Sequence, residues 1–270
     1  MTALTLTLRA APADDIDVSR LSPDHLRGRT PDDIRAMTVD IVGGGLRFGE
    51  LFDVAGDDAD HIHVQGACAR LLRIGAAMTT GSITVEGDAG PYAGAGMRGG
   101  ALTIEGSAGA FLATGMRDGH VEVRGDAGPC AGAAIAGERA GMRGGVVVIR
   151  GNAGERAGER MRRGQLLIAG DAGDFCGARM WAGTIIVLGR TGSEPGLRMR
   201  RGSLLVRRNA AVPPTFNDSG THALGVLRLL GKSLRDAGDG LATFAPPGDR
   251  VRRYVGDRAC DGLGEILVFE

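Results

Sequence analysis

The sequence predicts an all-β protein: a right-handed parallel β-helix of about seven to eight coils of 19 residues, with a short α/β flank before it and a helix and a strand after it. Three observations support this prediction: the glycine content, a recurring strand and a recurring methionine. Glycine supplies 47 of the 270 residues, about 17%, where ~7% is usual. Collagen is excluded because no three-residue period is present, and 43% hydrophobic residues argue against disorder. The chain therefore turns often.

The recurring strand and the recurring methionine share one period. A short apolar tract, such as Ser82-Ile83-Thr84-Val85-Glu86-Gly87, returns along the middle of the chain. Its eight copies begin at His61, Ser82, Ala101, His120, Val146, Gln165, Thr184 and Ser203. The methionines, each followed by x-x-Gly, are Met78, Met97, Met116, Met142, Met161, Met180 and Met199. Most steps are 19 residues, and one is 26 because seven residues are inserted around 135–141.

Each unit divides into a strand, a Gly-Asp-Ala-Gly corner, an arm of small residues and a Met-Arg-x-Gly corner. This division is typical of one coil of a parallel β-helix, in which equivalent positions stack about 4.8 Å apart. Two inward columns are expected. They are Ile83, Leu102, Val121, Val147, Leu166, Ile185 and Leu204, and Val85, Ile104, Val123, Ile149, Ile168, Val187 and Val206. The pattern does not fix the handedness, although 19 residues favour a right-handed coil over the roughly 18-residue left-handed type.

The flanks of the repeats predict three segments: an N-terminal flank of residues 1–60, a repeat domain of residues 61–208, and a C-terminal segment of residues 209–270 that packs on the repeats. Residues 3–8 alternate like a strand, and Ser22-Pro23 and Thr30-Pro31 each place a cap before a proline, which predicts two helix starts. Helical spacing of apolar residues predicts an amphipathic helix over about residues 221–235, followed by a final strand. The apolar residues are Ala223, Leu227, Leu230 and Leu234.

The outward column of the strands changes character along the chain. It reads Thr84, Thr103 and Glu122, then Val148, Leu167, Ile186 and Leu205. Four stacked aliphatic side chains form an adhesive patch unless they are covered. Two covers are open at this point: the chain's own helix near residues 221–235, which is the preferred one, or another subunit. The polar half of the column is expected to stay in solvent or at a wetter contact with another subunit.

Composition excludes several function classes. Lys+Arg and Asp+Glu each number 32, so the net charge gives no reason to expect nucleic-acid binding. No apolar run reaches the ~20 residues that cross a bilayer, and the N-terminus lacks the basic start of a secretory signal. Four cysteines without a CxxC pair fit a reduced, cytoplasmic protein. They are Cys68, Cys130, Cys176 and Cys260.

No catalytic residue and no metal ligand is assigned. His61 and His63 share one face of a strand, with Cys68 nearby, but no third ligand has convincing spacing, so a surface pair is the preferred interpretation. Nucleophile-elbow, P-loop and Rossmann motifs are not found. The methionine column is interpreted as core packing. A polar column is interpreted as capping turns rather than binding calcium. It comprises Asp88, Ser107, Asp126, Asn152 and Asp171.

One charged column stands out after the repeat methionines. It contains Arg98, Arg117, Arg143, Arg162 and Arg200, interrupted by Thr79 and Trp181. Like charges about 5 Å apart repel unless they are solvated or matched by anions. The column is therefore either a solvated fringe or a contact for an acidic subunit or a polyanionic cofactor tail. No cofactor-binding residue is identified.

The repeat Gly-x-x-x-Gly-x-x-Met-x-x-Gly, with its strand-Gly-Asp-Ala-Gly corners, resembles the family formed by the C subunits of formylmethanofuran dehydrogenases. The resemblance extends from Ser22-Pro23-Asp24 to Tyr254-Val255-Gly256-Asp257 and includes the long coil. Over the repeats alone, the chain is similar to the C-terminal β-helix domain of the glutamate synthase large subunit. The resemblance implies a right-handed β-helix that binds other subunits and carries no redox centre.

The Arg-rich, Lys-poor composition makes the chain most like the C subunit of bacterial formyltransferase/hydrolase complexes of one-carbon metabolism, formaldehyde oxidation and methylotrophy. The resemblance implies a structural subunit without catalytic residues or a cofactor of its own. In such a complex a formyl group passes from tetrahydromethanopterin to a methanofuran-like cofactor and is hydrolysed to formate, with zinc and the active sites in other subunits. The alternative is a glutamate-synthase-like module serving an amidotransferase. A self-sufficient carbohydrate enzyme is disfavoured because no acid/base pair is evident.

Overall fold

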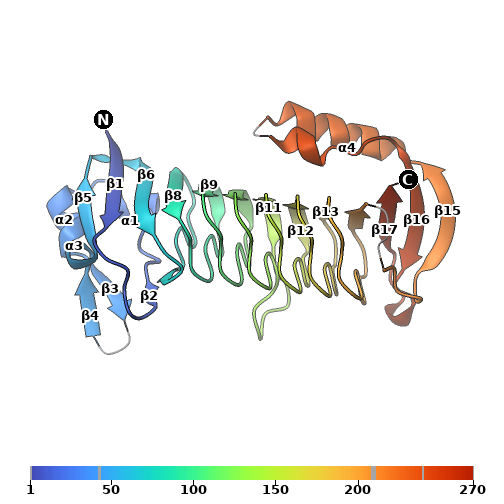
Figure 1. Ribbon diagram of the computed structural model, residues 1–270, viewed down its shortest axis with the longest axis horizontal. Helices are drawn as coiled ribbons and strands as arrows, with labels where there is room; N and C mark the ends of the chain where they lie inside the picture. The colour runs from blue at the N-terminus through green and yellow to red at the C-terminus, as the bar shows by residue number, and fades with distance from the viewer. Residues whose placement is uncertain (1, 42–43, 208–210, 239, 270) are drawn as a thin grey trace.

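The computed structural model describes all residues except 1, 42–43, 208–210, 239 and 270. The described chain is mostly β, with one mixed sheet of 13 strands, a second sheet of four strands, and few helices. Figure 1 shows an elongated molecule with the N-terminal elements at one end, a row of stacked repeats in the middle and the C-terminal elements at the other end. The all-β expectation is confirmed at this level.

The first copy of the repeat lies in β6 (Asp58–Ala67) and pairs in parallel with the strand of the next copy, and the repeats supply seven further strands of the large sheet. They are β8 (Ser82–Gly87), β9 (Arg98–Ile104), β10 (Asp118–Val123), β11 (Arg143–Ile149), β12 (Arg163–Ile168), β13 (Thr184–Val187) and β14 (Ser203–Val206). Each pairs in parallel with the next in sequence, so that Ile83 lies opposite Leu102 and Leu166 opposite Ile185. A second row of parallel bridges joins Ala89 to Ala108 and continues to Ala172. Equivalent positions of successive repeats therefore pair, as the period predicts.

The interior between these rows is apolar. Every side chain of the two predicted inward columns is at most 1% exposed. All seven repeat methionines are fully buried as well. From Met97 onward, the residue after each methionine donates its N–H to the carbonyl of the methionine one repeat earlier, as in Arg117 to Met97 at 2.7 Å and Arg200 to Met180 at 2.7 Å. The methionines thus form the predicted column in the core.

Backbone turning and side-chain capping shape the corners. At Gly145 φ is +78°, and a Cβ there would lie 2.8 Å from the carbonyl oxygen of Gly119, so a larger residue is strained and crowded. Along the polar column, each side chain accepts a hydrogen bond from a backbone N–H one repeat later. The Asp88 carboxylate accepts from Ser107 N at 2.8 Å, and the Asp171 carboxylate accepts from Arg190 N at 2.7 Å. The capping interpretation is confirmed, and the caps link neighbouring repeats.

The N-terminal flank closes one end of the large sheet. β1 (Ala3–Leu8) pairs in parallel with β6 (Asp58–Ala67) and antiparallel with β5 (Phe52–Ala55). The smaller sheet contains β2 (Ile16–Asp17), β3 (Thr38–Ile41), β4 (Gly44–Arg47) and β7 (Leu71–Leu72). The helices are α1 (Pro23–Leu26), α2 (Pro31–Ala36) and α3 (Phe48–Leu51). The predicted first strand and both proline-led helix starts are confirmed.

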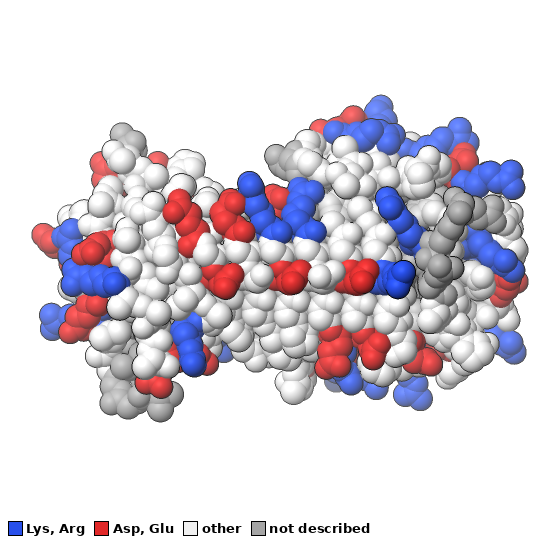
Figure 2. All heavy atoms as spheres, viewed as in Figure 1, with Lys and Arg blue, Asp and Glu red and all other residues white. Residues whose placement is uncertain are grey.

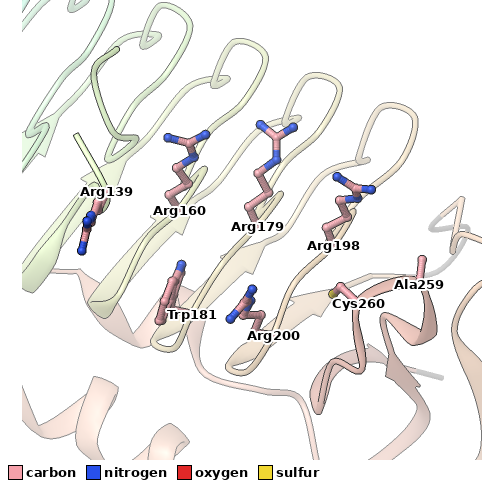
Figure 3. A pocket seen from close by; sticks show the side chains of 8 residues that line it. All are labelled: Arg139, Arg160, Arg179, Trp181, Arg198, Arg200, Ala259 and Cys260. Atoms are coloured by element: carbon pink, nitrogen blue, oxygen red, sulfur yellow. The ribbon is translucent and has the colours of Figure 1, made fainter. Parts of the chain in front are cut away.

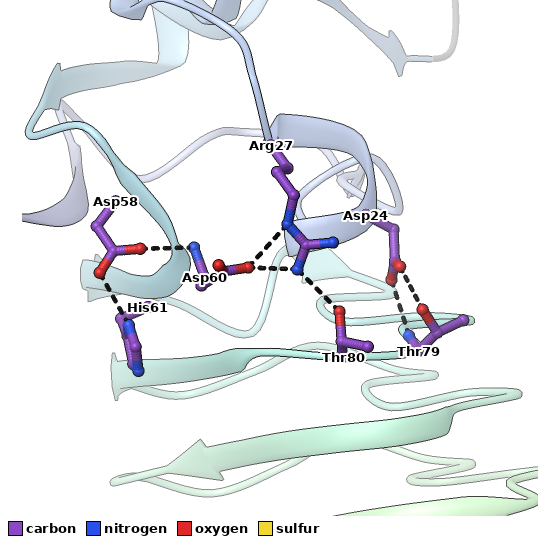
Figure 4. A network of polar contacts seen from close by, with 7 residues as sticks. All are labelled: Asp24, Arg27, Asp58, Asp60, His61, Thr79 and Thr80. Atoms are coloured by element: carbon purple, nitrogen blue, oxygen red, sulfur yellow. Dashed lines mark hydrogen bonds and ion pairs between the residues drawn. The ribbon is translucent and has the colours of Figure 1, made fainter.

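Polar contacts attach α1 to the first repeat (Figure 4). The Asp24 carboxylate accepts a hydrogen bond from Thr79 N at 2.8 Å and another from the Thr79 hydroxyl. Arg27 donates to Asp60 with Nε at 2.9 Å and to the Thr80 hydroxyl at 2.9 Å. Burial alone would raise the pKa of Asp24, but the Thr79 hydrogen bonds, together with the nearby Arg27 charge, hold the pKa below its usual value.

The C-terminal segment closes the other end. It contains β15 (Asn217–Ala223), α4 (Gly225–Asp236), the 3₁₀ turn η1 (Leu241–Phe244), β16 (Arg250–Gly256), the 3₁₀ turn η2 (Arg258–Cys260) and β17 (Gly264–Phe269). β17 pairs in parallel with β14, and β16 and β15 follow antiparallel. The predicted helix begins later than expected, because residues 217–223 pair with β16 instead. Ala223 is therefore an exposed strand residue, and its assignment to the helix was wrong. The predicted boundary between residues 208 and 209 lies outside the described residues.

The apolar outward column is covered by the chain itself. Val148, Leu167, Ile186 and Leu205 are at most 1% exposed. They share one cluster with Leu227 and Leu234 of α4, together with Leu241, Phe244, Val251, Leu267 and Phe269. Figure 1 shows α4 lying over the later repeats. The preferred cover is confirmed, although η1, β16 and β17 contribute to it beyond the predicted helix.

The polar half of the column differs partly from expectation. Thr84 and Thr103 are half-buried. Glu122 does not remain in solvent, because its carboxylate forms an ion pair with Arg150 at 2.9 Å and its side chain is 17% exposed. The Arg150 guanidinium lies 5.7 Å from the centre of the Phe244 ring and donates to the Gly240 carbonyl at 3.1 Å. This pair therefore lies where the C-terminal cover begins.

Candidate binding surface

The histidine pair lies on the surface of β6. His61 Nδ1 is 2.9 Å from an Asp58 carboxylate oxygen, and His63 Nδ1 is 3.9 Å from one of Glu86. Both rings are well exposed and each has a carboxylate neighbour, as expected for a surface pair. Among the described residues, no group of three His, Cys, Asp or Glu side chains is placed to hold a metal ion.

Cys176 and Cys130 lie in environments that disfavour the thiolate. Burial raises the pKa of the Cys176 thiol to about 12. Burial also raises the pKa of Cys130, and the nearby Glu159 carboxylate adds to that rise. A raised pKa leaves these thiols protonated near neutral pH, so neither is an activated nucleophile.

The structure places the predicted arginine column on successive corners, where its backbone N–H groups donate to the methionine carbonyls. The side chains of these arginines differ in exposure and in their neighbours. Arg98 and Arg117 are exposed on early repeats, while Arg143 is half-buried and lies 3.6 Å from Glu138. Arg162 and Arg200 line one hollow together, next to Trp181. The Arg200 guanidinium stacks 5.0 Å from the centre of the Trp181 ring.

A second row of arginines, which the sequence interpretation missed, lies beside Trp181. Arg160, Arg179 and Arg198 each precede a repeat methionine, and their φ values are +56°, +54° and +56°. With other residues they line a hollow of about 370 Å³ (Figure 3). The other lining residues are Arg139, Trp181, Arg200, Ala259 and Cys260. The 19-residue recurrence of Arg-Met in the last three repeats was the available signal.

A second hollow of about 430 Å³ shares Trp181 and Arg200 with the first. Its remaining lining residues are Arg162, Arg163, Ala182 and Arg201. We call the two hollows together the arginine groove. Its eight arginines are Arg139, Arg160, Arg162, Arg163, Arg179, Arg198, Arg200 and Arg201.

Few carboxylates balance this charge. Glu159 lies 2.9 Å from Arg179 and 3.9 Å from Arg160, and also pairs with Arg156 outside the groove. Within the described part of the chain, the ion pairs closer than 4 Å include none of the four arginines of the second hollow. The groove therefore carries an excess of positive charge, although the whole chain has a net charge of zero.

Asp257 holds η2, which forms one end of the first hollow, in place. The Asp257 side chain is fully buried and accepts hydrogen bonds from Arg198 N at 2.9 Å and Ala259 N at 2.8 Å. Burial alone would raise its pKa, but these backbone N–H donors hold the pKa below its usual value. Burial and the Asp257 charge raise the pKa of Cys260. A buried carboxylate thus anchors η2 against the last repeat.

Figure 2 shows another distribution of charge on the face viewed: acidic groups form a row along the stacked repeats, and basic groups gather over the C-terminal elements. No described helix combines the length and the apolar character needed to cross a membrane. Stacked repeats with a concentrated cationic groove along one side are typical of repeat proteins that bind partners along an extended surface.

Comparison with known proteins gives the family. The model of the family described as "GXGXG motif" matches residues 75–220, which is more than half of the chain. The chain also matches one chain in the crystal structure of the formyltransferase/hydrolase complex from Methylorubrum extorquens in complex with methylofuran. That match has a TM-score of 0.93 and 41% identity and covers 98% of this chain and 99% of the other. The protein belongs to the GXGXG motif family and, within it, to the family of formylmethanofuran dehydrogenase C subunits.

Two curated relatives illustrate this membership. The C subunit of the formyltransferase/hydrolase complex of Methylorubrum extorquens is 41% identical over 86 residues, which are 32% of this chain and 32% of the relative. The C subunit of the tungsten-containing formylmethanofuran dehydrogenase 2 of Methanothermobacter thermautotrophicus is 35% identical over 99 residues, 35% of this chain and 37% of the relative. The matched segments thus span about a third of the length of these curated relatives.

Proposed function

We propose that the chain is the non-catalytic structural subunit of a formyltransferase/hydrolase complex of one-carbon metabolism and methylotrophy. One observation carries the proposal: the fold follows a chain of such a complex over nearly its whole length, including both flanks of the repeats. The flanks matter because the alternative, a glutamate-synthase-like module, resembles the chain over the repeats alone. Partners are the other subunits of the complex.

The reaction of the proposed complex converts formyl-tetrahydromethanopterin to formate through a formyl-methanofuran-type cofactor. The solved relative contains methylofuran, and we propose that a complex containing this chain uses a cofactor of that kind. Zinc and the catalytic groups belong to other subunits in this proposal. The raised thiol pKa values and the surface location of His61 and His63 are consistent with a chain that carries no catalytic residue.

For the architecture, we propose a right-handed parallel β-helix over residues 61–208, with residues 1–60 and 209–270 as flanking segments. Support comes from the parallel pairing of equivalent positions in consecutive repeats and from the second row of alanine bridges. A cytoplasmic location is part of the same proposal, supported by four free cysteines. We also retain Arg98, Arg117, Arg143, Arg162 and Arg200 as a partner or polyanion contact.

Affinity purification of the tagged chain from its native cells tests the proposed function. We expect a zinc amidohydrolase-type subunit and a formyltransferase subunit to copurify in fixed ratio, and the eluate to release formate from a formylated furan cofactor. The isolated chain should show no such turnover, and His61→Ala or His63→Ala should leave the zinc content of the complex unchanged. Turnover by the pure chain, or copurification with a glutamate synthase instead, would contradict the proposal.

A further inference from the structure

We propose that the arginine groove binds an extended, acid-rich segment of a partner polypeptide, with Trp181 packing against the bound segment. The proposal rests on the proposed function only in supplying the chain with a partner. It gives a role to Trp181 and to arginines that lie outside the predicted column, among them Arg160, Arg179 and Arg198.

The first argument is the spacing of positive charge in the groove. Arg160 N donates to Ala178 O at 2.9 Å, and Arg179 N donates to Leu197 O at 2.7 Å, so consecutive arms pair in parallel. Two steps of about 4.8 Å place Arg160 and Arg198 about 10 Å apart along the stack. An extended polypeptide advances about 3.3 Å per residue, so carboxylates on alternate residues recur every ~6.6 Å along one side. Flexible arginine side chains can pair with such a row, whereas a single small anion contacts only part of it.

The second argument is the limited length of the groove. The seven-residue insertion in the long repeat supplies Arg139 at one end, and η2 supplies Ala259 and Cys260 at the other. Figure 3 shows Arg160, Arg179 and Arg198 side by side on successive arms between these ends, with Trp181 and Arg200 along one side. Both ends are irregular elements added to the repeat. They restrict the ligand to a short segment and exclude an indefinitely long polymer lying along every repeat.

The third argument is charge complementarity. Eight arginines line the groove, and Glu159 is the carboxylate that pairs with two of them. Bringing these guanidinium groups together is unfavourable until anions neutralise them. Carboxylates suit this role because guanidinium forms charge-assisted, often bidentate, hydrogen bonds with them. An acidic segment therefore gains further ion pairs with each repeat that it crosses.

The fourth argument is Trp181 itself. Its side chain is 45% exposed, although large aromatic residues are usually buried. It occupies the corner position that arginine holds in the repeats before and after it, and Arg200 stacks on its ring. Exposed tryptophan beside arginine is typical of the residues that contribute most to protein interfaces. The ring offers a flat apolar surface between the two cationic hollows.

Fluorescence titration of the full chain tests the proposal, because Trp181 is the only tryptophan in the sequence. The probe is a synthetic peptide of about ten residues with Glu at alternate positions, long enough to span the row. We expect a saturable change in fluorescence and an affinity that falls with added salt. The same peptide with Gln for Glu, free glutamate at equal carboxylate concentration, and inorganic phosphate are expected to cause no saturable change over the same range.

Paired substitutions locate the binding. Arg163→Gln with Arg201→Gln removes two exposed charges of the second hollow. Arg179→Asn with Arg198→Asn removes two charges of the row, and asparagine tolerates the positive φ there. Each pair should weaken peptide binding about tenfold or more. The matched control, Arg20→Gln with Arg29→Gln, removes equal charge from exposed positions of the N-terminal flank, outside the groove, and should change the affinity less than about twofold.

Three results would overturn the proposal: no binding of the acidic peptide, equal binding by the groove and control variants, or equally tight binding of free glutamate or phosphate. The last result would indicate a small-anion site. The peptide assay uses the chain alone, so it can succeed when copurification fails. If the peptide binds but no subunits copurify, the proposed function is contradicted and the proposed role of the arginine groove is supported. If subunits copurify but the peptide does not bind, the proposed function is supported and the proposed role of the groove is contradicted.

Discussion

The two halves of the repeat array share an interior but differ on the outside. Inward columns are equally apolar and buried from β8 to β14. The outward column is polar and half-buried on β8 and β9, yet fully buried on β11 to β14 beneath α4 and η1. A single outward position per repeat therefore decides whether a stretch of the array faces water or holds another segment. The interior builds the stack, and the outward column determines where the chain's own cover is placed.

The largest expected effect concerns the interior and is the same in both halves. Ile168→Asp in the later half and Ile104→Asp in the earlier half each place an unpaired carboxylate at a site with 0% exposure. Each should cost at least about 4 kcal/mol of unfolding free energy. Circular dichroism and urea denaturation of the two variants provide the measurement. If either variant had wild-type stability, the inward column of that half would not be part of the hydrophobic core.

The next effect separates the halves. Ile186→Asp introduces a charge beneath the C-terminal cover and should destabilise the chain by about 3 kcal/mol. Thr103→Asp introduces the same charge at the equivalent position of the earlier half, which is half-buried, and should cost less than about 1 kcal/mol. Thermal melting of the isolated chain measures both. Equal losses in the two variants would remove the distinction between covered and uncovered repeats.

A smaller effect tests the cover from its other side. Leu227→Ala truncates a side chain of α4 that is 2% exposed against the apolar column, and it should cost about 2–3 kcal/mol. Leu229→Ala, two positions along the same helix and 69% exposed, is the matched control and should change stability by less than about 0.5 kcal/mol. Urea denaturation compares them. If Leu229 proved the more costly truncation, the inward face of α4 would have been assigned incorrectly.

The smallest effect concerns the join between the N-terminal flank and the first repeat. Folding lowers the pKa of Asp24, so near the unfolded value of ~3.9 the unfolded state binds more protons and stability rises with pH. The contribution is fully present above that value and is lost as pH falls through the lower folded pKa. Asp24→Asn should therefore flatten the fall of melting temperature below about pH 4. An unchanged profile would mean that the Asp24–Thr79 contact does not stabilise the folded state.

Much of the fold was predictable because stacking imposes the same environment on each equivalent position. Ile83 and Ile185 meet the same kind of neighbours as the other members of their column, so the repeat pattern reveals their burial. The cover was predictable as well, since Leu227 and Leu234 match the width of the apolar column. The location of Ala223 in a strand was not predictable from local spacing. It depends on pairing with β16, which lies more than 25 residues away in the sequence.

The candidate site was predicted only in part. Corner arginines such as Arg162 and Arg200 were visible from their place after the methionines. Arg198 was missed although its place before Met199 recurs at the same period, and Arg139 could not be predicted because it lies on an insertion outside the period. Their convergence on Trp181 depends on how an arm, an insertion and η2 come together in space, and no spacing in the sequence records that.

The direction of the outermost strands has a consequence for self-association. Nothing in a stack of similar repeats limits its length, and an unpaired parallel edge strand can pair with a second copy of the chain and so start a fibre. Here the sheet ends in β5 on one side and β15 on the other, and each runs antiparallel to its neighbour. β5 has only four residues, and β15 carries a register shift between Asp218 and Thr221. Short or irregular edge strands disfavour end-to-end addition of a second copy, which leaves the long sides of the array for contact with partners.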